Sequence, residues 1–478
     1  MKGEFIAEPE LEFGGDGRHI DIRFGIMDYG PADAGLERAP DQIVAGLIGT
    51  PSTIEGARLW LERCREEIPA KASRQPNLFP RFPGFQPGTA FRSTLVVDSN
   101  LEREIPARDI DRLVRGEEHN RIVTDTVDRF CVEMRLLKEK RPPHVFLCAI
   151  PPEIDRLRDP DVRAARGEKG GEVFDFRRLL KARAMDLGIP TQLITPSTYD
   201  SAQRRTQKSR PERPRQLQDE ATRAWNLHTA LYYKAGGLPW RLVRDSAEFR
   251  TCYVGVSFFY GLDRSNIMTS MAQIFDERGD GIVVRGAPVR LSRDDRVPHL
   301  EEADACALLA QALRRYRAEH GAAPARVVLH KTSPFDVAER EGFATATEEE
   351  RIGRIDFVSV TERSAPRLFR RGPYPPLRGT LLSLSQREHV LYTRGSVDFY
   401  ATYPGMYVPR PLQFRFDEVT STPRAIASEM LALTKMNWNK TQFDQSEPIT
   451  VSAARRVGDI LKYVEEGRTI ESRYSYYM

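Results

Sequence analysis

Two basic side chains lie four residues apart in the segment Phe176–Gln192, which reads FRRLLKARAMDLGIPTQ. Residues four apart in an α-helix share a face, so Arg177 and Lys181 are expected to point the same way. The Gly-Ile-Pro sequence predicts the end of this helix, and Gln192 then lies at the start of an expected strand. Arginine grips a phosphate with two parallel donors, lysine supplies a point charge, and glutamine adds a neutral donor or an oxygen for a metal. Together these groups would suit a terminal phosphate.

A second helix, expected within residues 217–237, brings further polar groups. Lys234 stands before a Gly-Gly stop, and Asn226 lies about two turns earlier on the same face. The alternative is that Arg177 and Lys181 only solvate an exposed helix face, which is the commoner role of an isolated charged pair. The phosphate interpretation therefore depends on the fold, which must bring the two helices and the strand together.

The composition is that of an ordinary globular protein of 478 residues, with 40% apolar and 29% charged residues. This length allows two or three domains with their own cores. The sequence has no run of eighteen apolar residues and no secretory signal pattern, so we expect no membrane span and a cytoplasmic location. Five widely spaced cysteines without a Cys-x-x-Cys pair argue against a disulfide framework or a zinc site.

The expected elements would place the polar groups around a small parallel sheet. Residues 144–150 (HVFLCAI) predict a buried strand, followed by the helix and strand of the segment above and by the helix within residues 217–237. Alternation of this kind is typical of a doubly wound α/β sheet. A long helical region is expected over residues 110–140, and the strands and helix before it suggest another α/β unit.

The pattern changes after Trp240, where we place a domain boundary. Strands are expected at CYVGVSFFYG, IVVRGAPVRL, ARVVLHKTS, RIDFVSVTER, TLLSLSQREHVLYTRG and FYATYPGMYV. Helices are expected at EEADACALLAQALRRYRAEHG, STPRAIASEMLALTKMNW and TVSAARRVGDILKYVEE. The predicted organisation is an N-terminal α/β segment in residues 1–110 that packs on the rest, a domain in residues 111–240, and a domain in residues 241–478.

Taken in order, R-x-x-x-K, G-I-P-T-Q and W-N-L-H-T-A-L-Y-Y-K-A-G-G resemble the MID domain of Argonaute proteins. The resemblance implies a Rossmann-like fold whose pocket binds the 5′ phosphate of a guide strand. It also implies a Mg²⁺ ion at that phosphate, held partly by Gln192 and by the carboxylate of Met478 in an apolar tail. The positions matched to the family are Arg177, Lys181, Gln192 and Lys234, to which we add Asn226.

The residues after Trp240 resemble a PIWI domain, which is an RNase H-like fold, over CYVGVSFFYG, ARVVLHKTSPFDVAER, LTKMNWNKTQF and TVSAARRVGDIL. Cleaving members use carboxylates and a final Asp or His to hold two Mg²⁺ ions around the attacking water and the leaving oxygen. The matched positions here carry Ser257, Thr332 and either Ala454 or Arg455. Hydroxyls and a cation cannot hold two divalent ions, so we predict an inactive nuclease site without catalytic residues.

Two further segments are rich in basic residues although the net charge is only +4. Residues 204–215 carry six basic residues and one acid, and residues 363–379 carry five arginines and no acid. Arginine beside aromatic residues suits contacts to a nucleic-acid backbone and base stacking, whereas a solvated surface loop is the alternative. The predicted backbone-binding residues are Arg204, Arg205, Lys208, Arg210, Arg370 and Arg371.

Only about 110 residues precede the MID-like region, and the chain therefore resembles the short prokaryotic Argonautes. The resemblance implies a guide RNA, a single-stranded DNA target, and a heterodimer with an APAZ-containing effector, for which we favour a sirtuin-like over a TIR protein. Target recognition would make that effector deplete NAD in defence against plasmids or phages. Two alternatives remain: a guided Mg²⁺-dependent nuclease that uses Asp336 or Asp459, and a scaffold whose basic segments contact a protein.

Overall fold

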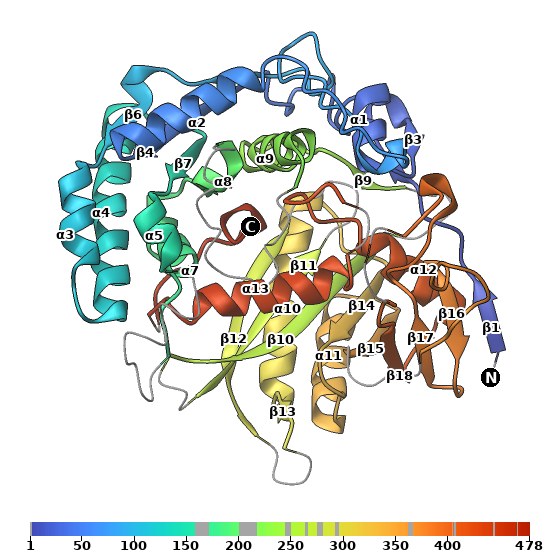
Figure 1. Cartoon of the computed structure of the whole chain (residues 1–478). Helices are drawn as coiled ribbons and strands as arrows, with labels where there is room; N and C mark the ends of the chain where they lie inside the picture. Colours follow the sequence, from blue (N-terminus) through green and yellow to red (C-terminus); the bar gives the residue numbers. More distant parts are fainter. Residues whose placement is uncertain are drawn as a thin grey trace.

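The structure is a computed structural model with two large sheets and one small one (Figure 1). It describes residues 2–157, 172–199, 218–243, 250–262, 266–274, 281–291, 296–361, 367–403, 405, 408–442, 445–465 and 467–478. None of the helices in these ranges combines the length and the hydropathy needed to cross a bilayer.

The sheet that carries the predicted phosphate residues has five strands, all parallel, in the order β5-β4-β7-β8 with β6 also paired to β4. Parallel neighbours need long crossover connections, which the intervening helices supply. Strand β7 is buried throughout and confirms the strand expected from HVFLCAI. The strands are β4 (Gln42–Gly49), β5 (Thr94–Val96), β6 (Glu102–Glu104), β7 (Val145–Ala149) and β8 (Thr191–Ile194).

The expected boundary at residue 110 does not coincide with a boundary between sheets, because β4, β5 and β6 pair with β7 in one sheet. The helix expected over residues 110–140 is also interrupted: it is divided near Gly116, a residue type that weakens helices. The helices are α1 (Ile22–Tyr29), α2 (Pro51–Arg63), α3 (Ala107–Val114), α4 (His119–Lys140), α5 (Pro152–Arg156), α7 (Phe176–Ala184), α8 (Pro196–Tyr199) and α9 (Glu220–Lys234).

The second large sheet has ten strands in the order β1-β16-β17-β18-β15-β14-β10-β11-β12-β13. Strands β10, β14 and β15 run parallel, and the other pairs are antiparallel. This mixed sheet agrees with the α/β class predicted for the second domain. Its strands are β1 (Lys2–Phe5), β10 (Thr251–Tyr260), β11 (Ile267–Ile274), β12 (Ile282–Leu291), β13 (Pro298–His299), β14 (Arg326–Lys331), β15 (Ile355–Thr361), β16 (Thr380–Ser383), β17 (Glu388–Leu391) and β18 (Leu412–Glu418).

Helices cover both faces of this sheet (Figure 1). Helix α13 crosses the near face over β10 and β11, and α10 and α11 pack together behind it. The strand expected at FYATYPGMYV is wrong for its described residues: Asp398–Tyr400 forms a 3₁₀ turn, and Ala401 is left-handed with φ 51°, so the chain turns there. The helices are α10 (Glu302–His320), α11 (Val337–Glu349), α12 (Pro423–Leu433) and α13 (Ile449–Leu461).

The N-terminal segment joins the two large sheets instead of forming a unit of its own. Strand β1 extends the ten-stranded sheet, and β2 (Leu11–Glu12) forms a small sheet with β3 (Arg18–His19) and β9 (Arg241–Leu242). The buried carboxylate of Glu8 pairs with Arg378 at 2.7 Å and with Lys435 at 3.0 Å. The segment is therefore locked to the second sheet by a buried ion-pair network.

Two buried histidines predict a loss of stability in acid. Burial lowers the pKa of His228 to about 4, and burial with the positive charge of Arg326 lowers that of His330 to about 3. In the unfolded chain each ring regains a pKa of about 6.5, so below that pH the unfolded chain binds more protons than the folded one. The free energy of unfolding should therefore fall between about pH 6.5 and 4, by roughly 1.4 kcal/mol per pH unit for each histidine.

Urea unfolding across this pH range checks the expectation, with His228→Phe as the test variant. The ring of His228 packs against Phe82 and Phe85 at 5.1 and 5.0 Å, so a phenyl ring should keep those contacts without the titration. The variant should lose about half of the acid sensitivity that the two histidines cause. An unchanged pH dependence would show that His228 does not cause it.

Candidate functional site

Helix α7 places the first two predicted residues on one face, as expected from their spacing. The carboxylate of Asp175 caps the helix by accepting a hydrogen bond from the backbone N–H of Arg178 at 3.0 Å. The helix runs on into a 3₁₀ turn, and Gly188, with φ 63°, reverses the chain into β8. Arg177 is half-buried on this helix, and the side chain of Lys181 is almost fully buried.

Three elements converge on the predicted pocket. From α7, the Lys181 ammonium donates to the carbonyl of Thr191, the first residue of β8, at 3.2 Å. From α9, the Lys234 ammonium donates to the side-chain oxygen of Gln192 on β8. The fold thus brings Lys181, Gln192 and Lys234 together from segments that are separated by loops and strands in the sequence.

Within the described part of the chain, the two buried lysines of this site have no acidic partner. Lys181 is 3% exposed and Lys234 is 5% exposed, and among the described residues neither ammonium contacts a carboxylate. Burial, together with Lys234 and Arg177, holds the pKa of Lys181 well below its usual value. Burial and the charge of Arg177 lower the pKa of Lys234 to about 7. An anion entering here would relieve both the desolvation and the mutual repulsion of the cations.

The two lysines buried elsewhere in the described part of the chain do have a carboxylate partner. The Lys331 ammonium lies 2.5 Å from the Glu339 carboxylate, and the Lys435 ammonium lies 3.0 Å from that of Glu8. A buried charge without a counter-charge is costly, and structural lysines are normally paired. The missing counter-charge therefore distinguishes Lys181 and Lys234 from the structural lysines of the same protein.

Asn226 lies two turns before Lys234 on α9. The structure places its side chain where the domain of the five-stranded sheet contacts the domain of the ten-stranded sheet. Its side-chain oxygen accepts hydrogen bonds from the backbone N–H of Thr441 at 2.9 Å and from the Thr441 hydroxyl at 3.0 Å. Its amide group donates to the side chain of Gln218 at 3.1 Å. Asn226 thereby fixes α9 to the NWNKTQF segment.

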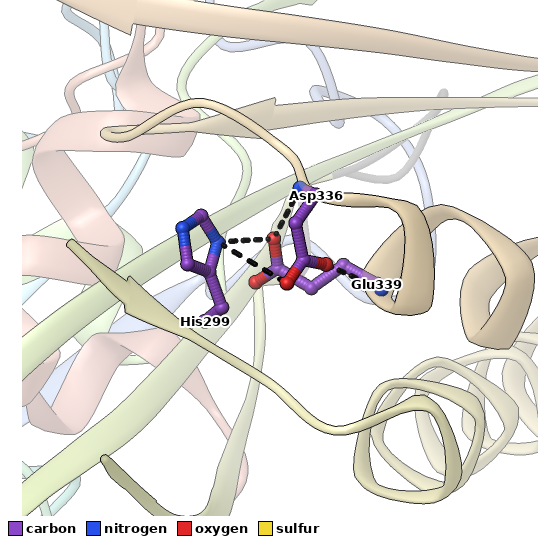
Figure 2. A group of neighbouring side chains, drawn as sticks. All are labelled: His299, Asp336 and Glu339. Atoms are coloured by element: carbon purple, nitrogen blue, oxygen red, sulfur yellow. Dashed lines mark hydrogen bonds and ion pairs between the residues drawn. The ribbon is translucent and has the colours of Figure 1, made fainter. Parts of the chain in front are cut away.

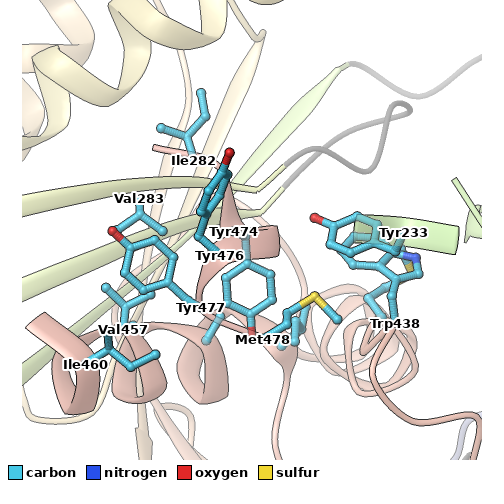
Figure 3. Close-up of a cluster of buried hydrophobic side chains, with 14 of the residues drawn as sticks. Tyr233, Ile282, Val283, Trp438, Val457, Ile460, Tyr474, Tyr476, Tyr477 and Met478 are labelled. Atoms are coloured by element: carbon cyan, nitrogen blue, oxygen red, sulfur yellow. The ribbon is translucent and has the colours of Figure 1, made fainter. Parts of the chain in front are cut away.

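The C-terminal tail is buried beside α9, as expected from its apolar residues. The 3₁₀ turn Tyr474–Tyr476 contacts α9, and Met478 is 1% exposed. Figure 3 shows the Met478 side chain directed toward Trp438 and Tyr233, whose rings stack at 4.5 Å. Since Tyr233 precedes Lys234, the tail lies close to the helix end that carries the second lysine.

Two of the positions matched to the PIWI nuclease site, Ser257 and Thr332, lie side by side in the structure. Ser257 lies on β10, buried to 4% exposure, and Thr332 directly follows the adjacent parallel strand β14. The backbone N–H of Thr332 donates to the carbonyl of Val256 at 3.4 Å, which places the two hydroxyl residues beside each other where the pairing of β10 with β14 ends. On α13, the Arg455 guanidinium makes two hydrogen bonds to the carboxylate of Glu447, at 2.7 and 2.8 Å.

Beside these positions lies a cluster that the sequence did not reveal: His299, Asp336 and Glu339 (Figure 2). The Asp336 carboxylate caps α11 by accepting from the backbone N–H of Glu339 at 2.8 Å, and the imidazole of His299 lies 3.0 Å from the Glu339 carboxylate. The Lys331 ammonium also contacts that carboxylate, at 2.5 Å, and the carbonyl of Pro334 at 2.8 Å. The Lys331 ammonium thus contacts a carboxylate oxygen that a metal ion bound to this cluster would need.

The two acids considered as displaced metal ligands have structural partners. Asp336 caps α11, as described above, and the Asp459 carboxylate pairs with the Arg178 guanidinium of α7 at 2.7 Å. The pattern D-x-x-E at Asp336–Glu339 is a capping box, which sequence inspection could have identified. The contribution of His299 could not be found in this way, because it lies on strand β13, far from α11 in the sequence.

A cavity of about 540 Å³ on the second domain is lined by three arginines and a tyrosine, namely Arg367, Arg394, Arg410 and Tyr403. The predicted Arg370 and Arg371 lie nearby in sequence and are exposed, next to Phe369, which is 77% exposed. The other predicted backbone-binding residues lie outside the described part of the chain: Arg204, Arg205, Lys208 and Arg210.

No family model and no curated protein matches the sequence. Solved structures match the fold. Clostridium butyricum Argonaute, bound to a guide DNA and a 19-mer target DNA, has a TM-score of 0.66 at 15% identity over 99% of this chain and 54% of its own. Drosophila Piwi has a TM-score of 0.59 at 15% identity, over 99% and 56%. A. aeolicus Argonaute has a TM-score of 0.56 at 12% identity, over 98% and 54%.

This chain spans about half the length of the solved Argonaute and Piwi chains that it matches. At these identities the likeness establishes the fold, and it agrees with the predicted arrangement of a Rossmann-like MID domain followed by an RNase H-like PIWI domain.

Removing one of the uncompensated cations should stabilise the protein in the absence of nucleic acid. Lys181→Met keeps an unbranched side chain, slightly shorter than that of lysine, and removes the ionisable group, so we expect the free energy of unfolding to rise by about 2 kcal/mol near neutral pH. Urea unfolding measures the change. Lys138→Met, at an exposed position on α4, is the control and should change stability by less than about 0.5 kcal/mol. A less stable Lys181→Met variant would mean that this charge has a counter-charge in the free protein.

Proposed function

We propose that this chain is the guide-binding, target-sensing subunit of a short prokaryotic Argonaute system. The observation that carries the proposal is the pair of buried lysines, Lys181 and Lys234, which have no carboxylate partner among the described residues. A terminal phosphate brings about two negative charges at neutral pH and would supply the missing counter-charge. The similarity in fold to an Argonaute solved with a guide and a target supports a guided mode of binding.

In this proposal the guide is an RNA held by its 5′ end. Arg177, Lys181 and Lys234 donate charge-assisted hydrogen bonds to the phosphate, and Gln192 orients Lys234. The oxygen atoms of the site also suit Mg²⁺, which prefers oxygen ligands. The side-chain oxygen of Gln192 and the terminal carboxylate of Met478 would hold that ion, which would offset the repulsion between carboxylate and phosphate.

The rest of the guide and a single-stranded DNA target would lie along the second domain. The arginine-lined cavity offers donors to backbone phosphates, and such contacts bind without reading sequence. Sequence would be read by base pairing between guide and target. Arg370, Arg371 and Phe369 add exposed charge and an exposed ring for the same purpose.

We propose that the duplex is held without being cut. Two-metal cleavage requires several carboxylates around the scissile phosphate, and the matched positions on β10 and directly after β14 carry the hydroxyls of Ser257 and Thr332 instead. The nearby carboxylate of Glu339 is already paired with Lys331. An uncut target stays bound, which suits a sensor.

The signal would pass to a separate APAZ-containing effector bound as a heterodimer, with a sirtuin-like protein preferred over a TIR protein. The effector would deplete NAD when a plasmid or phage target is recognised. This part of the proposal rests on the resemblance to short prokaryotic Argonautes. Co-expression with the partner, followed by measurement of NAD consumption on addition of a complementary target, tests it directly.

The 5′-phosphate site predicts a preference that can be measured with a short RNA carrying either a 5′ phosphate or a 5′ hydroxyl. The wild-type protein should bind the phosphorylated RNA more tightly by at least about tenfold, and Mg²⁺ should strengthen that preference. Lys181→Met should remove most of the preference, because one charge-assisted hydrogen bond is worth about 1.5–3 kcal/mol. Lys138→Met should bind as wild type does. Equal affinity for both RNAs would instead favour a scaffold with nonspecific basic surfaces.

The inactive nuclease site predicts that the guide-loaded protein leaves a complementary DNA intact in Mg²⁺ or Mn²⁺. Asp336→Ala should cost about 1 kcal/mol of stability through the lost helix cap and should change nothing in a cleavage assay. Metal-dependent cutting by the wild type that disappears in Asp336→Ala would support the guided-nuclease alternative.

A further inference from the structure

Helix α7, which carries Arg177 and Lys181, is clamped to α13 of the other domain by contacts that the phosphate site does not use. The guanidinium of Arg178 pairs with the carboxylate of Asp459 at 2.7 Å. Next to it, the ammonium of Lys462 pairs with the carboxylate of Glu172, and both side chains are largely buried. The first turn of α7 therefore meets the last turn of α13 through the pair of Arg178 and Asp459, and the residues just outside the two helices, Glu172 and Lys462, form a second ion pair.

Tyr463 adds a third contact at the same place. Its hydroxyl accepts a hydrogen bond from the backbone N–H of Asp175 at 3.0 Å, and its ring meets that of Phe174 edge to face at 5.5 Å. Asp175 is the residue that caps α7 by accepting from the N–H of Arg178. The hydroxyl thus holds the backbone at the point where the helix starts.

The far end of the helix is held by the same C-terminal segment. Asp186, in the 3₁₀ turn that extends α7, forms an ion pair with Arg468. The chain between Asp459 and Arg468 therefore contacts α7 at both ends. A helix fixed at its two ends cannot slide or tilt without breaking these contacts.

We propose that Asp459 and Tyr463 are positioning residues for the phosphate site: they hold α7 so that its cations meet the 5′ phosphate. The inference rests on the proposed function. Arg178 stands next to Arg177 and three residues before Lys181, so a shift of its backbone moves both. Phosphate contacts depend on distances of about 3 Å, and a displacement of about 1 Å is enough to weaken them strongly.

The ion pair between Arg178 and Asp459 is partly exposed, with the side chains at 40% and 35%. Exposed pairs contribute little to global stability, so their loss need not unfold the protein. Loss of the ion pair is expected to act locally and to change the orientation of α7. This gives the test a readout, the ratio of affinities for 5′-phosphorylated and 5′-hydroxyl RNA, that a purely structural role would leave unchanged.

The experiment exchanges the two charges. Asp459→Arg and Arg178→Asp, each alone, should lower the affinity ratio about fivefold, and the double variant should return it to within about twofold of wild type. Affinity for the 5′-hydroxyl RNA should stay within about twofold throughout. A general electrostatic effect predicts the opposite for Asp459→Arg, because an added positive charge near the pocket would raise phosphate affinity. A fall in the ratio therefore identifies lost positioning.

Glu465→Arg is the matched control, since it makes the same change of charge at an exposed position just beyond α13. It should keep the wild-type ratio. Tyr463→Phe removes only the hydroxyl and provides a second variant if charge reversal prevents folding; it should lower the ratio about threefold.

The outcomes separate the two proposals. A wild-type protein that binds both RNAs equally contradicts the proposed function itself. A wild-type preference that persists in Asp459→Arg, Arg178→Asp and Tyr463→Phe overturns the positioning role alone. A ratio that falls in both single charge variants without recovery in the double variant also overturns it, because the pair would then not act as a pair.

Discussion

Lys181 and Lys234 place two amino groups in the interior of the first domain, and no carboxylate of the described residues contacts them. Their depressed pKa values express the cost, which arises first from burial and then from neighbouring positive charge. Lys331 and Lys435 are buried as deeply, yet each lies beside a glutamate. Among the described residues, the buried lysines that serve the fold therefore have a carboxylate partner, and the two without one lie where helix α7, strand β8 and helix α9 converge. A protein can tolerate such a site when a ligand completes it.

The surrounding structure holds the three elements of that site in place. The parallel sheet fixes β8, Asn226 joins α9 to Thr441 of the second domain, and the C-terminal segment holds α7 at both ends. Rigid support matters because a cluster of like charges tends to move apart. In the second domain, by contrast, a buried lysine has a carboxylate partner. The Lys331 ammonium pairs with the Glu339 carboxylate, so that carboxylate is not available to bind a metal ion.

Local patterns in the sequence were sufficient for the elements that carry the site. The four-residue spacing on α7, the Gly-Ile-Pro stop and the buried HVFLCAI strand are local signals, and the structure follows them. Contacts between distant segments were out of reach. Arg178 and Asp459 are 281 residues apart, and neither side chain differs from an ordinary surface charge until the fold pairs them. The same holds for His299 beside Glu339 and for β4, whose pairing with β7 moves the start of the first sheet ahead of residue 110.

The most direct test of the central claim is an experimental structure of the protein loaded with a 5′-phosphorylated RNA. The account predicts the 5′ phosphate between α7 and α9, with its oxygens within about 3.2 Å of the ammonium groups of Lys181 and Lys234. A 5′ phosphate bound elsewhere, for example in the cavity lined by Arg367, Arg394 and Arg410, would contradict it. In that case the two lysines would be buried charges whose purpose is not guide binding.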